Sequence, residues 1–351
     1  MINYYGTCDK SGEATGHLPK VTKEYKELFQ SEDQVSLAAS PCIVDGIGDV
    51  GFCHVYQLPY DIMTENYNNL WKRIADKFKI LTNVHQAFQI AGYDIIWFYR
   101  VDFFLLLYMM FQKKAKGKQI CLVYQMSGGK GVERKIFDYV YKKGMRKFDG
   151  IIYTQSLMKV PVEKNFYMPD YWYKKEIYDQ YASWPKEKKA VCLGTMNPYK
   201  KLEELVSVFN DCGFPLEIIG HFFDKERAEK LRRRAKSNIK IDDCILNEVE
   251  YYNKLGSARY AVLPYDMDQY RNRTSGILLE SVFLGVIPIA PEELLRTNGL
   301  SGISYSSISE ISEKISGEWD AGILRENIEK IKNNFDEDSI KDRFRKWLSS
   351  L

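Results

Sequence analysis

The segment from Ala258 to Pro291, ARYAVLPYDMDQYRNRTSGILLESVFLGVIPIAP, contains the most informative pattern in the sequence. It begins as an apolar strand that ends in Leu-Pro-Tyr, and a polar loop follows. Ser275 and Gly276 open a predicted helix, because a serine at a helix start accepts hydrogen bonds from free backbone N–H groups. Gly285 closes this helix before a short second strand. The segment therefore predicts a strand–helix–strand unit of a parallel α/β domain.

The same alternation extends on both sides of this segment. The predicted strands of the second half are Ala190–Gly194, Leu216–Gly220, Ile239–Ile245, Tyr260–Tyr265, Val286–Ala290 and Gly302–Tyr305. The predicted helices between them are Lys201–Asn210, Lys225–Ser237, Glu248–Leu255, Gly276–Leu284 and Pro291–Arg296, each with apolar residues at helical spacing. This order predicts a parallel sheet that is covered on both faces and binds ligands at the carboxyl ends of its strands.

The first half is less regular but also predicts an α/β domain. Its candidate strands are Ile2–Thr7, Val35–Ala38, Ile95–Tyr99, Ile120–Tyr124 and Gly150–Thr154. Its candidate helices are Lys20–Phe29, Tyr67–Phe78, Phe103–Lys114 and Glu133–Lys147. A linker is expected around Tyr167–Lys189, where periodicity is weak, and a charged helical tail is expected over Ile323–Leu351.

Composition limits the class of protein. The 351 residues suffice for two domains, and 45% hydrophobic with 28% charged residues is ordinary for soluble proteins. A net charge of +3 does not indicate a nucleic-acid binder. The seven cysteines form no C-x-x-C pair, so we expect reduced thiols and neither disulfides nor a zinc site. Without a recognisable secretory signal, and with Phe103–Phe111 too short to span a membrane, the expected location is the cytoplasm.

The start of the predicted helix at Ser275 suits a phosphate. The free N–H groups and the positive end of a helix attract anions, and Gly276 allows a ligand to approach the backbone closely. Glu280, one turn further on, is placed to accept hydrogen bonds from a ribose diol. A glutamate on so apolar a helix is also expected to have a partner. Together these residues predict a pocket for a nucleotide diphosphate, although serine caps and closing glycines also occur in parallel α/β domains without such a ligand.

The segment resembles the carboxyl-terminal signature of GT-B glycosyltransferases, most closely glycosyltransferase family 4. Val191–Phe209 is similar to the first strand and helix of the family's second domain, with a phosphate-binding lysine at Lys200. Leu216–His221 and Glu248–Tyr265 are similar to the elements that precede the signature. The resemblance covers nearly all of Ala190–Pro291 and is fainter in the amino half.

This resemblance implies an α/β GT-B fold: two facing Rossmann-like domains with a cleft between them and a carboxyl-terminal helix that crosses back. The expected domains are 1–170 for the acceptor, 171–330 for the nucleotide sugar, and 331–351 for the helix that packs back on the first domain. The implied function is a hexosyltransferase that moves a sugar from a nucleotide-diphosphate donor, of the UDP or GDP type, to a hydroxyl of a glycan or polyprenyl-linked glycan. The family implies retention of configuration, with no metal and no other cofactor.

The resemblance also implies roles for individual residues. The implied catalytic positions are Asn272, which would hold the donor sugar, Glu280 and His17. The implied diphosphate ligands are Lys200, Arg273, Thr274, Ser275 and Gly276. The implied nucleotide-binding residues are Gly194, Thr195 and Glu280. The candidates on the acceptor side are Gly16, Arg100, Asp102 and Gln125. For His17, Arg100 and Asp102, a solvated loop or a structural ion pair is the competing interpretation.

The sequence departs from the family pattern at three positions. The family's first glutamate is Asn272 here, its basic residue after the first glycine is Thr195, and its amino-half histidine is Gln125. Arg271 or Arg273 would then supply the missing charge. These departures leave two alternatives open: a non-catalytic glycan-binding or nucleotide-binding partner of another transferase, and a GT-B-shaped nucleotide-sugar epimerase.

Two motifs are typical of other protein classes, but the sequence around them does not fit those classes. Gly46, Gly48 and Gly51 spell G-x-G-x-x-G, yet a strand-like stretch follows, where a dinucleotide site requires a helix. Asp266 and Asp268 spell the D-x-D of metal-dependent transferases, but they lie inside the GT-B-like signature. We therefore expect neither a dehydrogenase nor a metal site.

A peripheral membrane contact is a further hypothesis. The apolar run Phe103–Phe111 precedes Lys113, Lys114, Lys116 and Lys118, and apolar surfaces with basic flanks bind anionic lipid. The opposing interpretation is that a helix apolar on all sides is buried. A lipid-linked acceptor at the inner face of the membrane would give such a contact a use.

Overall fold

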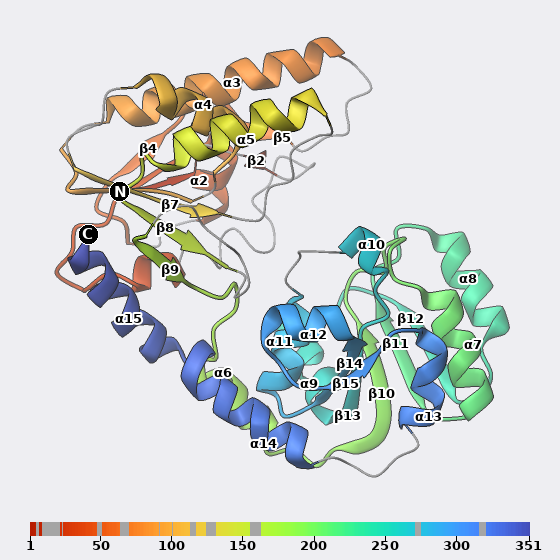
Figure 1. The fold of residues 1–351 in the computed structure, drawn as a ribbon. Helices are drawn as coiled ribbons and strands as arrows, with labels where there is room; N and C mark the ends of the chain where they lie inside the picture. Colours follow the sequence, from red (N-terminus) through yellow and green to blue (C-terminus); the bar gives the residue numbers. More distant parts are fainter. Residues whose placement is uncertain are drawn as a thin grey trace. The chain divides into compact units, whose positions relative to one another are not determined.

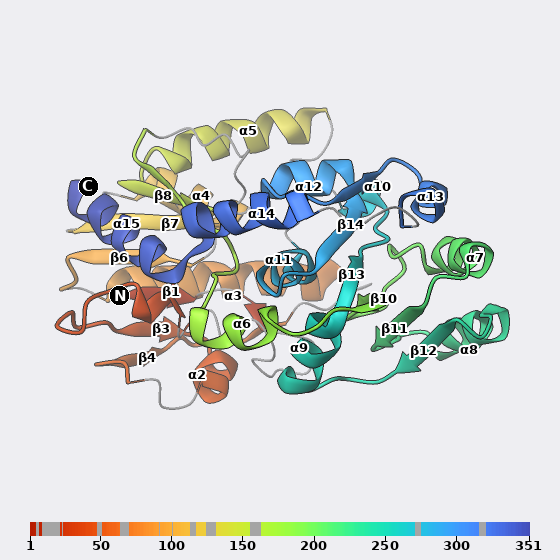
Figure 2. The ribbon, with the colours of Figure 1, turned by 90° about the horizontal axis from the view of Figure 1, so that it is seen from below.

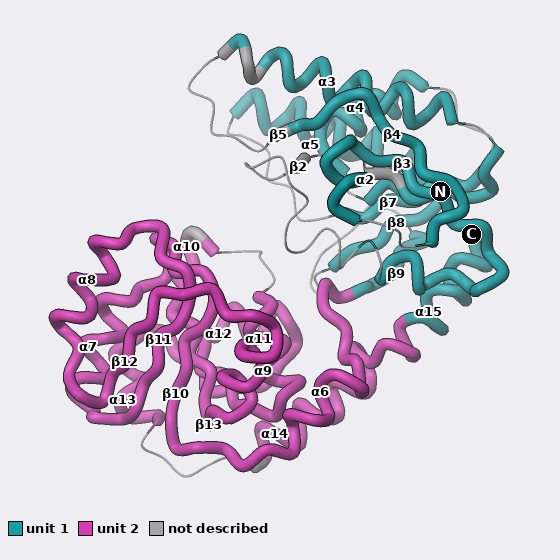
Figure 3. Tube along the Cα trace, turned by 180° about the vertical axis from the view of Figure 1, so that it is seen from behind, with its two compact units in different colours: residues 1–154, 158–168, 341–351 teal, residues 155–157, 169–340 magenta. Residues whose placement is uncertain are grey.

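The computed structural model describes residues 1–4, 7–8, 22, 24–47, 51–63, 70–90, 92–99, 101–112, 117–123, 131–154, 163–270, 275–315 and 321–351. The chain forms two compact units, each built around a parallel sheet (Figures 1 and 3). Unit 1 comprises residues 1–154, 158–168 and 341–351, and unit 2 comprises residues 155–157 and 169–340.

Unit 1 contains a seven-stranded parallel sheet in the order β4-β3-β1-β6-β7-β8-β9. Its strands are β4 (Val55–Gln57), β3 (Leu37–Ala39), β1 (Ile2–Tyr4), β6 (Ile95–Phe98), β7 (Lys118–Val123), β8 (Gly150–Tyr153) and β9 (Asn165–Tyr167). β2 (Thr7–Cys8) and β5 (Ile62–Met63) form a separate parallel pair. Its helices include α2 (Pro41–Ile47), α3 (Leu70–Gln89), α4 (Phe103–Phe111) and α5 (Val132–Met145). The central strands are almost continuously apolar because helices cover them.

Unit 2 contains a six-stranded parallel sheet in the order β12-β11-β10-β13-β14-β15. Its strands are β12 (Ile239–Asp243), β11 (Leu216–Gly220), β10 (Glu187–Leu193), β13 (Ala258–Val262), β14 (Ile287–Pro291) and β15 (Ile303–Tyr305). Its helices are α6 (Lys175–Ala182), α7 (Leu202–Cys212), α8 (Lys225–Arg234), α9 (Glu248–Ser257), α10 (Met267–Tyr270), α11 (Gly276–Phe283), α12 (Glu292–Asn298), α13 (Ile311–Ile315) and α14 (Ala321–Lys330). Figure 2 shows α7 and α8 on one face of the sheet and α9 and α11 on the other.

The core of unit 2 lies on both sides of its sheet. Successive side chains of a strand point to opposite faces, so Val191 and Leu193 enter one apolar cluster while Ala190 and Cys192 enter the other. The first cluster includes α9 and α11, and the second includes α7 and α8. Burial on both faces explains why the predicted strands of this half are short apolar runs without alternation.

The carboxyl-terminal tail returns to unit 1 at residue 341. A π-helical turn, Ile331–Phe335, leads into α15 (Glu337–Ser350), whose Phe344 is fully buried. Its ring lies 5.7 Å from that of Trp97 on β6 and 5.7 Å from that of Phe166 on β9. Arg345 donates hydrogen bonds to the carbonyl oxygens of Leu28 and Phe29. The helix that crosses back is therefore held by both aromatic packing and charged hydrogen bonds.

Three sequence expectations need correction. The stretch Tyr167–Lys189, expected to be a linker, contains α6 and the start of β10, because Tyr178 and Tyr181 bury their rings in the core of unit 2. The predicted helix Tyr67–Phe78 is found as α3, which continues to Gln89. Not every thiol is free: Cys42 is disulfide-bonded, although Cys53, Cys121, Cys192, Cys212 and Cys244 are free.

Of the G-x-G-x-x-G stretch, Gly46 lies near the end of α2, Gly48 lies outside the described residues, and no helix begins at Gly51. Gly51 adopts a positive φ of 66°, and the next element is the strand β4. No helix within the described ranges is both long and apolar enough to cross a membrane.

Candidate functional site

The strand order of unit 2 reverses between β10 and β13, and ligands of doubly wound sheets bind at such a reversal. β10 and β13 are neighbours, and from them the chain proceeds to β11 and β12 on one side and to β14 and β15 on the other. Ligands of doubly wound sheets bind at the carboxyl ends of the strands that flank this reversal. Gly194 and Thr195 directly follow β10, and Leu263 to Tyr265 follow β13. The strand order and the sequence signature therefore point to the same edge.

The first turn of α11 contains Gly276, whose lack of a side chain allows a ligand to approach the backbone closely. The Ser275 hydroxyl accepts a hydrogen bond from the Leu278 N–H at 3.3 Å and lies 3.3 Å from the Tyr265 hydroxyl. A Cβ at Gly276 would lie 2.4 Å from the hydroxyl oxygen of Tyr171, so any larger residue there would require the Tyr171 side chain to move. The free N–H groups of this turn carry the positive end of the helix dipole.

Gly194 is also required by its surroundings. Its φ of +89° is a left-handed conformation, and a Cβ there would lie 2.9 Å from Cδ1 of Ile277 on α11. A Cβ at Gly220, where β11 ends, would lie 1.7 Å from the Gly194 carbonyl oxygen. The loop after β10 thus packs closely against α11 on one side and β11 on the other. Thr195 beside it is exposed.

Lys200 is buried beside this loop. Its ammonium nitrogen donates a hydrogen bond of 2.7 Å to the Leu193 carbonyl oxygen and lies 5.8 Å from the centre of the Tyr265 ring. Burial lowers the pKa of Lys200, and the nearby Cys192 thiol raises it by less. Within the part of the chain that the structure describes, no carboxylate pairs with Lys200. A buried cation without a counter-charge is costly, so an anionic ligand would stabilise it.

A salt bridge fixes the loop that contains Lys200. Arg227 on α8 pairs with Glu203 and donates hydrogen bonds to the carbonyl oxygens of Asn197 and Lys200. The charge of Arg227 holds the pKa of Glu203 below its usual range, chiefly through their hydrogen bond. Arg227 lies 30 residues from Asn197 in the sequence, and its place in the loop follows from the packing of α8 beside α7.

Glu280 has the partner that its apolar helix requires. It is buried on α11, and its carboxylate accepts a hydrogen bond of 2.6 Å from the hydroxyl of Tyr251 on α9. Burial and the Glu280 charge raise the pKa of Tyr251 well above its usual value, so this hydroxyl remains protonated as the donor. Tyr251 was not among the candidates from sequence, because nothing local distinguishes it from the other tyrosines.

Tyrosines line this edge of the sheet. The rings of Tyr265 and Tyr270 stack with their centres 3.9 Å apart, and Tyr199 lies 5.6 Å from Tyr270. The sequence has an aromatic excess, at 14%, and it places these three tyrosines in predicted loops of the site, where aromatic rings stack on sugars or bases. Their clustering accounts for part of that excess.

The remaining predicted residues fall into two groups. Asp102 caps α4, because its carboxylate accepts a hydrogen bond from the Leu105 N–H at 2.8 Å. Asp266 of the D-x-D motif accepts a hydrogen bond from the Asp268 N–H at the start of α10. The others lie outside the described residues: Gly16, His17, Arg100, Gln125, Asn272, Arg273 and Thr274.

A cavity of about 680 Å³ lies in unit 1, at the opposite, amino edge of its sheet. Residues at the starts of strands line it, among them Ser36, His54 and Lys118, together with Arg345 of α15. None of the sequence signatures reaches this edge. The carboxyl edges remain the candidate sites.

Comparison with known proteins identifies the fold. No family model matches the chain, and no curated protein sequence matches it. Among solved structures, the chain is similar to a UDP-forming α,α-trehalose-phosphate synthase from Burkholderia xenovorans, with a TM-score of 0.66, 10% identity and 99% coverage of both chains. It is similar to AviGT4, a glycosyltransferase involved in avilamycin A biosynthesis, with a TM-score of 0.59, 12% identity, and 99% of this chain and 95% of that chain covered. It is similar to Acinetobacter baumannii MurG, with a TM-score of 0.54, 14% identity, and 99% and 98% covered. The structure therefore has the GT-B glycosyltransferase fold.

Proposed function

We propose that this protein transfers a sugar from a nucleotide-diphosphate donor to a hydroxyl of a glycan or lipid-linked glycan. The observation that carries the proposal is the buried Lys200, which has no carboxylate partner among the described residues and lies at the reversal point of a GT-B sheet, where the glycine-serine start of α11 also lies. An anion placed there would give Lys200 a counter-charge and would use the free N–H groups of the helix.

The residues of unit 2 would divide the work as follows. Lys200 and the first turn of α11, with Ser275 and Gly276, would stabilise the charge that develops on the diphosphate leaving group. Because these donors are already fixed by packing, they need little reorganisation when the charge develops. Glu280 would accept hydrogen bonds from the ribose, with Tyr251 holding one of its oxygens.

The donor is expected to be of the UDP or GDP type, and a similar structure described as UDP-forming supports UDP as the first to test. The likeness to family 4 further suggests retention of configuration without a metal. The matching test is transfer in the presence of EDTA: we expect full activity. Restoration of activity only by Mn²⁺ would instead favour a metal-dependent enzyme that uses Asp266 and Asp268.

Nucleotide binding is the first measurement. In a thermal-shift screen over UDP, GDP, ADP, CMP and dTDP, one nucleotide should stabilise the fold by about 2.7 kcal/mol at a hundredfold excess over its Kd. Binding without transfer to any acceptor would favour the non-catalytic alternative. Conversion of the donor without an acceptor would favour the epimerase.

Glu280→Gln tests the ribose contact. It keeps the shape of the side chain but removes the charge, and a hydrogen bond to a charged group contributes about 1.5–3 kcal/mol. We expect the donor KM to rise about tenfold to a hundredfold. Glu292→Gln, on the exposed first turn of α12, is the matched control and should leave KM unchanged. An unchanged KM in Glu280→Gln would refute this role of Glu280.

A further inference from the structure

Three helices of unit 1 lie side by side on one face of its sheet. α4 packs against both α3 and α5, and Figure 1 shows all three on the same side. The inner side of α3 is buried through Ile80, Val84 and Ala87. Among the described residues of unit 1, most of the exposed large apolar side chains lie on these three helices.

α3 carries a row of large apolar side chains on its outer side. Trp71, Ile74 and Phe78 are 77%, 38% and 66% exposed. Spacings of three and four residues place them on one stripe of the helix. A stripe facing away from the core is the reverse of the pattern expected of a helix that contacts only its own domain.

α5 carries a second stripe with the same spacing. Val132, Ile136 and Tyr139 are 73%, 54% and 58% exposed. Single exposed apolar residues are normal, but contiguous apolar patches mark interaction surfaces. These six side chains on α3 and α5 are called the α3–α5 surface below.

α4 lies between the two stripes and is largely buried, although Phe111 at its end is 79% exposed. Leu105, Leu106 and Met109 of this helix are buried, as the opposing interpretation of the run Phe103–Phe111 expects. Half-buried rings continue the apolar surface across it. The ring of Phe103 stacks on that of Phe137 of α5, and Lys77 of α3 lies over the ring of Phe104.

Basic side chains flank the α3–α5 surface. Lys135, Lys142 and Lys143 of α5 are exposed and have no acidic partner among the residues that the structure describes. Lys143 follows Tyr139 by one turn on the same stripe. Lys77 is exposed between α3 and α4. Apolar side chains bordered by unpaired lysines complement a bilayer with anionic headgroups.

The α3–α5 surface begins near the carboxyl edge of the sheet of unit 1. α3 leads into β6, and β7 precedes α5, so both helices run antiparallel to the strands. Their first turns, with Trp71 and Val132, therefore lie toward the carboxyl edge of the sheet. This is the edge at which a parallel sheet binds its ligand.

We propose that the α3–α5 surface docks unit 1 on an anionic lipid bilayer. This inference rests on the proposed function, because docking would serve to hold a lipid-linked acceptor near the carboxyl edge of unit 1. Docking itself requires no turnover, so the two proposals can fail separately.

The test is sedimentation of the full-length protein with vesicles. The protein should bind vesicles of phosphatidylcholine with phosphatidylglycerol, and bind those of phosphatidylcholine alone more weakly. The double variant Phe78→Ser/Ile136→Ser should lower the partition coefficient by about tenfold or more, because two apolar side chains no longer enter the bilayer. The matched control is Phe223→Ser/Ile245→Ser, which removes side chains of unit 2 that are at least as exposed and should bind as the wild type does.

A second variant isolates the charges. Lys135→Gln/Lys142→Gln/Lys143→Gln should lose binding to anionic vesicles, and the wild-type binding should weaken with added salt. Nucleotide binding measured on each variant shows whether it is folded and whether the donor site is intact. The proposal would be overturned if the wild-type protein did not bind anionic vesicles, or if the Phe78→Ser/Ile136→Ser variant bound them as well as the wild type does. Light scattering that shows a dimer broken by this variant, with vesicle binding unchanged, would assign the surface to a second copy of the chain instead.

Discussion

Glu280 shows how one buried carboxylate links the core to the candidate site. A charged side chain on an apolar helix must be paired or hydrogen-bonded, because burial in the core removes its water. The hydroxyl of Tyr251 provides that bond from the neighbouring helix α9. Because the bond engages Oε2, it orients the whole carboxylate, and we interpret Tyr251 as a positioning residue for Glu280.

Tyr251→Phe tests this interpretation. Removal of the hydroxyl leaves a buried carboxylate oxygen without this donor, so we expect the free energy of unfolding to fall by about 1–3 kcal/mol. We also expect the nucleotide Kd to rise several-fold, as measured by calorimetry. Tyr305→Phe is the control, since its buried hydroxyl donates a hydrogen bond of 2.7 Å to the Leu263 carbonyl oxygen and has no carboxylate partner among the described residues. Equal effects of the two variants on Kd would argue against positioning by Tyr251.

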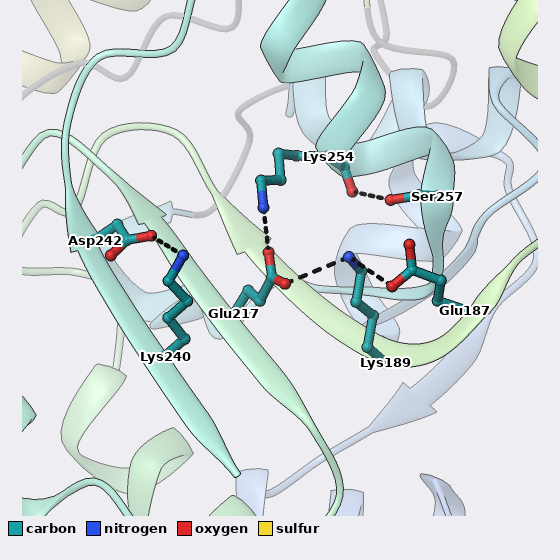
Figure 4. Close-up of polar contacts among 7 residues, drawn as sticks. All are labelled: Glu187, Lys189, Glu217, Lys240, Asp242, Lys254 and Ser257. Carbon is teal, nitrogen blue, oxygen red and sulfur yellow. Dashed lines mark hydrogen bonds and ion pairs between the residues drawn. The ribbon is translucent and has the colours of Figure 1, made fainter. Parts of the chain in front are cut away.

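At the scale of elements, a charged network ties three elements of unit 2 together. Glu217 on β11 pairs with Lys189 on β10 and with Lys254 on α9, as Figure 4 shows. Burial raises the pKa of Glu217, but the hydrogen bond from Lys254 and the charge of Lys189 outweigh burial and leave it below its usual value. Lys240 and Asp242 form a separate, more exposed pair on β12.

Glu217→Gln should lower the free energy of unfolding by about 1 kcal/mol near neutral pH, as measured by urea unfolding. Since the folded-state pKa of Glu217 lies below the unfolded-state value, this contribution is present above the unfolded-state pKa of about 4.3. It disappears as the pH falls through the folded-state pKa. Asp242→Asn should change stability by less than about 0.5 kcal/mol. A difference between wild type and Glu217→Gln that grows on acidification would contradict the assignment.

At the scale of the whole molecule, the carboxyl-terminal tail belongs to both units in turn. Phe335 is buried in the core of unit 2, while Phe344, nine residues later, is buried among aromatic rings of unit 1. The two phenylalanines are similar in chemistry and burial, so they form a matched pair of probes.

Phe344→Ala and Phe335→Ala should each cost about 3–5 kcal/mol, but in different units. Hydrogen exchange should show faster amide exchange in β6 and β9 for Phe344→Ala, since Trp97 and Phe166 lose their contact. For Phe335→Ala it should be faster around α6 and α11, because Phe283 and Tyr173 adjoin that site. Faster exchange spread evenly over both units in either variant would contradict this division.

The sequence predicted the second half more accurately than the first. The bounds of β11 were predicted to the residue, and those of α11 and β15 to within one residue. The predicted linker over Tyr167–Lys189 was wrong because α6 is short and its pattern is governed by two buried tyrosines. α2 and the short β9 were not predicted, since each has too few residues to display a period.

The alternation of strands and helices, the closing glycines and the Ser-Gly start of α11 could be predicted from the sequence alone, because these depend on local backbone preferences and on apolar spacing. Only the tertiary structure decided which partners meet. Tyr251 donates a hydrogen bond to Glu280, which is 29 residues away in the sequence, and Arg227 donates one to the backbone of Lys200. The helices α3 and α5 expose their apolar stripes, while α4 is largely buried. Such contacts depend on how helices pack on a sheet, and no local pattern records which side chains of distant elements will adjoin.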